Sequence, residues 1–149
     1  MSSIPEPIVV ELTLEAPADI VWQAITDKDQ MRQWFFETIS DFQPDAGFET
    51  EFIVHCEGTD YPHQWKVKEV EPGKRIAYGW RYGGIPGDST VNWELSETPE
   101  GTKLVFTQEF HNSFPEDNPI FSRAAGIAGW NYFVCEQLPA FLKLKQTAQ

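Results

Sequence analysis

The sequence predicts an α+β domain in which one long C-terminal helix covers an antiparallel sheet. Three observations indicate this: one strand-like segment opens the chain, five segments with a period of two fill its centre, and a helical pattern closes it. With 149 residues the chain has the size of one domain, and we expect a single domain over residues 1–149. A single helix over a curved sheet cannot fill all the space beneath it, so we also expect an internal cavity.

The first strand and two short helices precede the main part of the sheet. Residues 8–15 alternate from Val10 onward and are rich in β-branched side chains, as in a strand. Pro17 suits the first position of a helix, where Asp19 faces the positive helix end. Thr26-Asp27 can end this helix and cap a second one. In that second helix, apolar residues recur at helical spacing: Met31, Trp34 and Phe35.

Five segments with alternating apolar side chains predict the remaining strands, and turns such as Pro72-Gly73 and Glu100-Gly101 separate some of them. The residues expected to face inward are Phe48, Thr50, Phe52, Val54, Trp65, Val67, Ile76, Tyr78, Trp80, Tyr82, Val91, Trp93, Leu95, Leu104, Phe106, Gln108 and Phe110. The intervening side chains are largely charged or polar. One apolar face and one charged face indicate an antiparallel sheet that contacts water on one side only.

Asn118 as N-cap and Pro119 at the next position predict the start of the closing helix. Its expected inward stripe consists of Ile120, Ala124, Ile127, Asn131, Val134, Cys135, Leu138 and Leu142. Gly126 and Gly129 each weaken a helix interior by roughly 1 kcal/mol relative to Ala, so we expect them to permit close approach of a backbone or a ligand. Pro139 is expected to kink the helix or to remove one of its hydrogen bonds.

Composition argues against several partners and locations. Lys and Arg number 11 against 23 Asp and Glu, and the resulting net charge of -12 repels nucleic-acid phosphates and anionic headgroups. No signal peptide and no membrane-spanning run is visible, so we expect no membrane insertion and a cytoplasmic location. Cys56 and Cys135 lie in apolar surroundings without Cys-x-x-Cys spacing, and we interpret them as small buried hydrophobes.

No catalytic group stands out among the inward-facing positions, whereas an enzyme needs a nucleophile or an acid–base group in its pocket. Five polar residues can either orient a ligand or be satisfied by a neighbour or a buried water: Thr50, Tyr78, Gln108, Asn131 and Tyr132. Three histidines fall on separate segments without metal-ligand spacing: His55, His63 and His111. We therefore expect neither a metal nor another cofactor. Residues 83–87 join two strands, so their glycines indicate a hairpin loop instead of a phosphate-binding loop.

The element order and several motifs resemble the START-like helix-grip (SRPBCC) superfamily, in particular homologues of the activator of the 90-kDa heat-shock-protein ATPase. The matching segments are residues 16–27, Trp34-Phe35, residues 67–72, residues 75–80, residues 102–108 and Gly129-Trp130. The chain departs from the family pattern at Gly73, often a proline, and at Gln108, often a histidine. The resemblance implies a helix-grip fold: a curved antiparallel six-stranded sheet wrapped around a long C-terminal helix, with two short helices between strands 1 and 2.

The superfamily includes lipid carriers, polyketide cyclases, hormone receptors and co-chaperone domains, so the fold alone does not select a function. A cavity with aromatic walls and a few amide or hydroxyl groups suits a flat or elongated apolar molecule. We therefore predict that the domain binds a small hydrophobic molecule, lipid-like or aromatic and polyketide-like, between the sheet and the last helix. The predicted ligand-binding residues are Phe52, Trp65, Tyr78, Trp80, Trp93, Phe106, Gln108, Ile127, Asn131 and Val134.

Two other functions stay open. The first is a co-chaperone-like protein-interaction module that modulates a chaperone ATPase, for which the acidic surface would serve a basic partner. The second is a cyclase-like or hydratase-like enzyme. The expected partners are accordingly a small hydrophobic ligand and, in the alternative, a chaperone or another protein, with the chain as a monomer or a homodimer.

Overall fold

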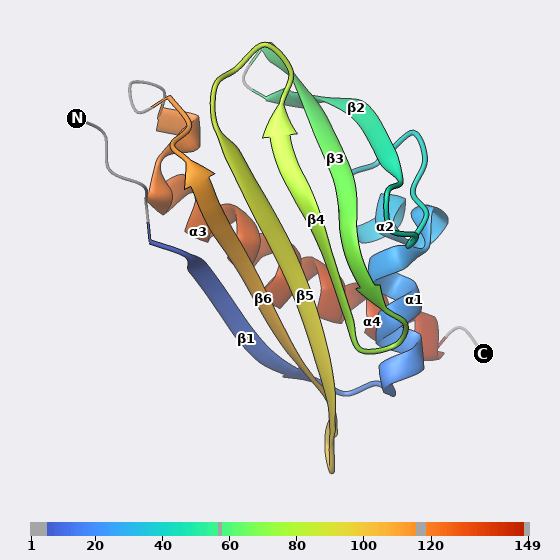
Figure 1. Cartoon of the computed structure of the whole chain (residues 1–149). Helices are drawn as coiled ribbons and strands as arrows, with labels where there is room; N and C mark the ends of the chain where they lie inside the picture. The colour runs from blue at the N-terminus through green and yellow to red at the C-terminus, as the bar shows by residue number, and fades with distance from the viewer. Residues whose placement is uncertain (1–5, 57, 116–118, 148–149) are drawn as a thin grey trace.

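The computed structural model describes residues 6–56, 58–115 and 119–147. Six strands form one antiparallel sheet in the order β1-β6-β5-β4-β3-β2 (Figure 1). They are β1 (Ile8–Leu14), β2 (Glu49–Cys56), β3 (Thr59–Glu71), β4 (Arg75–Tyr82), β5 (Asp88–Thr98) and β6 (Gly101–Asn112). Strands β2 to β6 pair as consecutive neighbours, and β1 extends the sheet beyond β6. The predicted six-stranded antiparallel sheet is thus confirmed.

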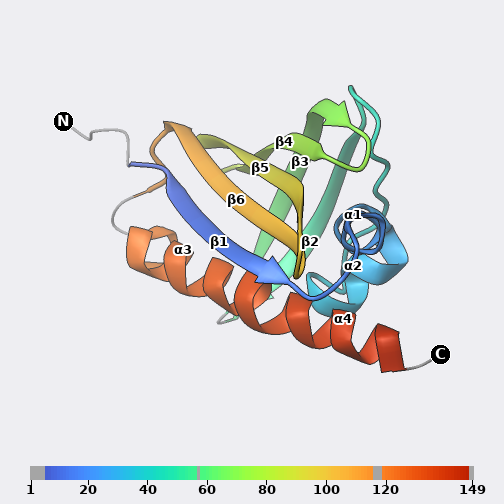
Figure 2. The same ribbon diagram turned by 90° about the horizontal axis from the view of Figure 1, so that it is seen from below.

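Two short helices and one long helical region cover the concave face of this sheet. Helices α1 (Ala18–Thr26) and α2 (Lys28–Trp34) follow β1, and Asp27 caps α2 by accepting a hydrogen bond from the backbone N–H of Gln30 at 3.2 Å. The long region comprises η1 (Pro119–Phe121), α3 (Arg123–Trp130), η2 (Asn131–Gln137) and α4 (Leu138–Thr147). Figure 2 shows the sheet curving over this long helix, which confirms the α+β helix-grip fold.

The closing helix starts later than predicted. Asn118 lies outside the described residues, and Pro119 opens a 3-10 turn instead of the α-helix. The N-cap of α3 is Ser122, whose Oγ accepts a hydrogen bond from the backbone N–H of Ala125 at 3.1 Å. Because a serine hydroxyl satisfies one of the free N–H groups of the first turn, the α-helix begins after Ser122.

The inward stripe of the closing helix is also displaced from the prediction. Asn131 is exposed, and the neighbouring Trp130, only 6 % exposed, faces the sheet instead. The buried positions then continue at a spacing of four: Trp130, Val134, Leu138 and Leu142. Cys135 is exposed as well, so the interpretation of this thiol as a buried hydrophobe is wrong. One residue turns an α-helix by about 100°, so a shift of one position exchanges an inward side chain for an outward one.

An irregular turn precedes Pro139. Residues Asn131–Gln137 form a π-helix, and the N–H of Leu138 donates to the carbonyl of Phe133, five residues back. Pro139 has no N–H and cannot donate a hydrogen bond to the preceding turn, and the wider π-turn lies directly before this position. The helix continues beyond Pro139 as α4.

Aromatic rings fill the core beneath the middle of the long helix. The ring of Phe35, directly after α2, stacks on Trp34 with centroids 4.9 Å apart. It also contacts rings from three strands and from the closing helix: Trp65, Trp80, Trp93, Trp130 and Phe133. This packing makes the rings around Phe35 part of the core, and a cavity lies beside them, toward η1 and α3.

Candidate functional site

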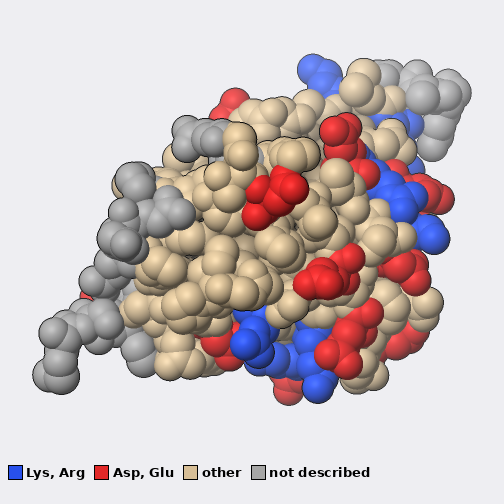
Figure 3. Space-filling view, turned by 90° about the horizontal axis from the view of Figure 1, so that it is seen from above, with Lys and Arg blue, Asp and Glu red and all other residues tan. Residues whose placement is uncertain are grey.

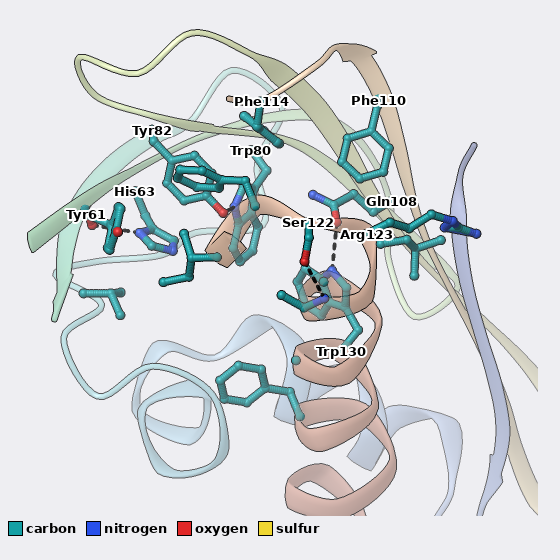
Figure 4. A pocket seen from close by; sticks show the side chains of 18 of the residues that line it. Tyr61, His63, Trp80, Tyr82, Gln108, Phe110, Phe114, Ser122, Arg123 and Trp130 are labelled. Carbon is teal, nitrogen blue, oxygen red and sulfur yellow. Dashed lines mark hydrogen bonds between the residues drawn. The ribbon is translucent and has the colours of Figure 1, made fainter. Parts of the chain in front are cut away.

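A cavity of about 470 Å³ lies between the sheet and the start of the closing helix (Figure 4). It is partly open to the surface. Its aromatic walls come from β3, β4, β6, the segment after β6 and η1: Tyr61, Trp80, Tyr82, Phe110, Phe114 and Phe121. Several of these rings contact one another at centroid distances of 5.0 to 5.7 Å: Tyr61, Tyr82, Phe114 and Phe121. The cavity therefore has a continuous aromatic wall on the side of the β3–β4 strand ends.

Helix α3 contributes small residues to the opposite wall. Ser122, the N-cap, and Ala125 and Gly129 of α3 line the cavity at spacings of three and four, which places them on one helix face. Phe133 of η2 continues this face with a large ring. A Cβ atom at Gly126 would lie 3.1 Å from Cδ1 of Ile8, so the expected close approach at this glycine is to the side chain of β1. A Cβ atom at Gly129 would meet no atom within 4 Å. Gly129 thus leaves open space on the cavity side of the helix.

A buried chain of hydrogen bonds ties the closing helix to the sheet. Nε1 of Trp130 donates to Oε1 of Gln108 at 2.8 Å, and Nε2 of Gln108 donates to Oγ of Ser89 at 3.1 Å. The Ser89 hydroxyl donates to the backbone carbonyl of Trp80 at 2.9 Å. These contacts cross β6, β5 and β4 in turn. Gln108 therefore uses its amide at both ends within the protein, and its first role is to position Trp130.

His63 brings a titratable group to the cavity wall. It is 6 % exposed, and Nδ1 lies 2.9 Å from the backbone carbonyl oxygen of Tyr61. A carbonyl can only accept a hydrogen bond, so Nδ1 carries the proton and Nε2 is left as an acceptor. Burial lowers the pKa of His63 to about 4, against the smaller opposing effect of the Tyr61 hydrogen bond. The imidazole is therefore neutral at pH 7, and Figure 4 shows its second nitrogen directed into the cavity.

The other polar side chains of the wall carry no charge into the cavity. The Tyr82 hydroxyl accepts a hydrogen bond from Nε1 of Trp80 at 2.9 Å, and burial raises the pKa of Tyr82 to about 12, so the phenol stays protonated. Arg123 lines the cavity with its stem, while its guanidinium extends toward β1 and donates to the carbonyl of Pro7 at 3.2 Å (Figure 4). The described lining groups consequently suit an uncharged ligand.

The surface at this end of the molecule is also poor in charge. In the view from above, the side that carries η1 and α3 shows few charged side chains, whereas Lys, Arg, Asp and Glu side chains gather on the other side (Figure 3). Among the described residues, no cluster of three or more His, Cys, Asp or Glu could hold a metal ion. Within the same residues, no helix has the length and apolar character needed to cross a membrane.

The structure brings two of the ten predicted ligand-binding residues to the cavity, Trp80 and Gln108. Six others are buried in the packed core: Phe52, Trp65, Tyr78, Trp93, Phe106 and Val134. Ile127 is half-buried on α3, and Asn131 is exposed on the π-helix, contrary to its expected place on the buried stripe. The inward face was thus identified correctly, but most of its large residues pack against one another and do not line the open space.

Three further polar candidates lie outside the cavity wall. The Tyr78 hydroxyl accepts a hydrogen bond from Nε1 of Trp93 at 3.0 Å, and burial raises the pKa of Tyr78. The Thr50 and Ser40 hydroxyls are paired at 3.1 Å. Tyr132 is 48 % exposed. Tyr78 and Thr50 thus follow the alternative in which a neighbouring group satisfies the polar atom.

The lining residues missed by sequence reasoning fall into two kinds. His63 lies two residues before Trp65 and so shares its inward face, and Tyr82 and Phe110 were recognised as inward-facing. The alternation of the strands contains the signal for these three residues. Phe114 precedes the predicted closing helix and Phe121 lies off its expected inward stripe, so only the folded chain brings these two rings to the wall.

Comparisons with known proteins agree with this geometry. The family model described as "Activator of Hsp90 ATPase homolog 1-like protein" matches residues 15–143. None of the curated proteins matches the chain. Among solved structures, DynU16, a protein of the dynemicin biosynthetic locus, is 27% identical and superposes with a TM-score of 0.74. The match covers 93% of this chain but only 48% of the DynU16 chain.

Two further solved structures cover more of their own length. MLL2253 from Mesorhizobium loti is 27% identical, with a TM-score of 0.73 over 93% of this chain and 97% of its own. CalU16 from Micromonospora echinospora is 25% identical, with a TM-score of 0.66 over 95% of this chain and 79% of its own. The helix-grip arrangement of this chain therefore recurs in proteins of similar sequence.

Proposed function

The chain belongs to the family of Activator of Hsp90 ATPase homolog 1-like proteins, and we propose that it binds a small apolar molecule, aromatic or lipid-like, in the cavity between the sheet and α3. One observation carries the proposal: the cavity of about 470 Å³ is partly open, has aromatic walls and presents neutral polar groups. Small-molecule sites typically enclose roughly 300 to 1,000 Å³ with mostly apolar walls and a few polar groups. The similarity to DynU16, from a biosynthetic locus, also supports a small-molecule ligand.

Gly129 provides the test, because it lines the cavity and a Cβ atom at this position would meet no atom within 4 Å. We expect Gly129→Leu to fold and to be as stable as the wild type or more so, since Gly in a helix interior is less favourable than other residues by up to about 1 kcal/mol. The same variant should lose affinity for the neutral fluorophore N-phenyl-1-naphthylamine, because the leucine side chain occupies the space of the ligand. Stability and binding therefore change in opposite directions.

Two variants serve as matched controls. Ala128→Leu places the same side chain at the preceding position of α3, which is exposed and does not line the cavity. Gly129→Ala gains most of the helix propensity while filling little space. Fluorescence titration of all four proteins should give wild-type affinity for Ala128→Leu, a small loss for Gly129→Ala and a large loss for Gly129→Leu. Equal affinity of Gly129→Leu and Ala128→Leu for the fluorophore would refute binding in this cavity.

The ligand class can be read from displacement of the same fluorophore. Naphthalene derivatives represent flat aromatic ligands and decanoic acid represents lipid-like ones. A ligand that binds only the folded chain at 100 times its Kd stabilises it by about 2.7 kcal/mol, so a thermal scan gives an independent measure.

A protein-interaction module is the second candidate, supported by the family description and by the net charge of -12. A contact made by the charged surface does not depend on the cavity. For that function, Gly129→Leu should leave the binding of a chaperone unchanged in a pull-down, and the apolar fluorophore should not bind the wild type.

A further inference from the structure

We propose that His63 selects hydroxylated aromatic ligands, by accepting a hydrogen bond from a phenolic O–H of the ligand at Nε2. The inference rests on the proposed function and specifies the chemistry of its ligand. It does not require any other residue to change its role.

The role of Nε2 follows from the backbone around His63. The Tyr61 carbonyl, 2.9 Å from Nδ1, accepts the proton of that nitrogen and holds the ring in a single tautomer. The lone pair of Nε2 therefore points away from β3 and toward the cavity (Figure 4). A ligand group that meets Nε2 must be a hydrogen-bond donor.

Two other polar groups of the wall already have protein partners. The amide of Gln108 is held between Trp130 and Ser89, and the Tyr82 oxygen accepts from Trp80. Nε2 of His63, by contrast, has no hydrogen bond to any described residue. An acceptor in such apolar surroundings is unfavourable unless a water or a ligand donates to it, so it discriminates between ligands with and without a donor.

The rings around His63 favour a flat ligand at this acceptor. The imidazole lies edge-on to the rings of Tyr82, Trp80 and Phe36, with centroids 4.8, 5.3 and 5.2 Å away. Aromatic ligands pack well against such rings in offset or edge-to-face contacts. A methyl ether in place of the hydroxyl would set oxygen lone pairs against Nε2, and a carboxylate would do the same while burying a charge. The site therefore disfavours ethers and fatty-acid anions.

The experiment compares 2-naphthol with 2-methoxynaphthalene, which share the same ring system, at pH 7. We expect wild type to prefer 2-naphthol by about tenfold in Kd, the ratio that one hydrogen bond of ordinary strength produces. In His63→Phe, which keeps a flat buried ring, this preference should fall to about onefold while 2-methoxynaphthalene retains its affinity. A tenfold preference that persists in folded His63→Phe would overturn the inference.

Nitrogen NMR of the wild-type protein tests the same contact without a variant. The Nε2 resonance of His63 should move upfield on addition of 2-naphthol and stay in place with 2-methoxynaphthalene, while the exposed His55 and His111 provide reference signals in the same spectrum. An unchanged Nε2 resonance with bound 2-naphthol would refute the hydrogen bond. If both compounds bind equally well, this inference fails and the proposed function stands; if neither binds, both fail.

Discussion

Lowering the pH from 7 to 4 is expected to destabilise the protein through His63. The pKa of this imidazole is about 4 in the folded chain, below its ordinary value of 6.5. As the pH falls below 6.5, the unfolded chain binds a proton that the folded chain does not yet bind. The stability associated with neutral His63 is therefore complete above pH 6.5, declines as the pH falls and is lost by about pH 4.

The magnitude follows from the two pKa values. The difference between 6.5 and about 4, at 1.36 kcal/mol per pKa unit, amounts to roughly 3 kcal/mol. This is a large part of the stability of an ordinary domain, which is about 5 to 15 kcal/mol. The cause is desolvation: the imidazolium would have to lie among the rings of Phe36, Phe52, Trp80 and Tyr82.

Urea unfolding at pH 7, 6, 5 and 4 measures this effect, with His63→Gln as the comparison. The carboxylates titrate in both proteins, so their contribution cancels in the difference between the two free energies of unfolding. We expect that the wild type loses roughly 3 kcal/mol more than His63→Gln between pH 7 and 4. Parallel curves for the wild type and His63→Gln would refute the desolvation of His63.

Three further predictions concern the closing helix and one turn. Trp130→Phe should destabilise the fold by about 2 to 4 kcal/mol in urea unfolding, because it leaves a cavity and removes the donor to the buried Gln108 carbonyl. Asn131→Leu should change the free energy of unfolding by less than about 0.5 kcal/mol and leave the affinity for N-phenyl-1-naphthylamine unchanged, because Asn131 is exposed. A large loss of stability or of affinity would contradict the exposed position of Asn131. Gly101→Ala should lower Tm far more than Gly84→Ala: both glycines have positive φ, but only a Cβ at position 101 would collide with a backbone oxygen, that of Leu14.

The strands and their inward face could be predicted because they depend on local properties of the chain. Side chains alternate along a strand with a period of two, so Trp65 and Val67 share a face wherever the strand lies. Asp27 ends one helix and caps the next through bonds to residues only a few positions away. The sequence therefore determined the element order, the six-stranded sheet and the side of it that is buried.

The register of the closing helix needed the tertiary structure. Both Trp130 and Asn131 fit a helical stripe at spacings of three and four, and they differ by a rotation of about 100°. The choice between them depends on a partner 22 positions earlier in the chain, Gln108, which accepts the hydrogen bond of the indole. No local pattern near residue 130 contains this contact.

The place of the cavity was likewise decided by contacts between distant segments. The aromatic residues of the sheet were recognised as one inward set, but the ring of Phe35 after α2 fills the space beside Trp65 and Trp93 and turns these residues into core. The open space remains beside the small residues of α3, such as Gly129. Periodicity tells which side chains point inward, whereas the volume left between them depends on how all the packed elements fit together, and this is a property of the whole fold.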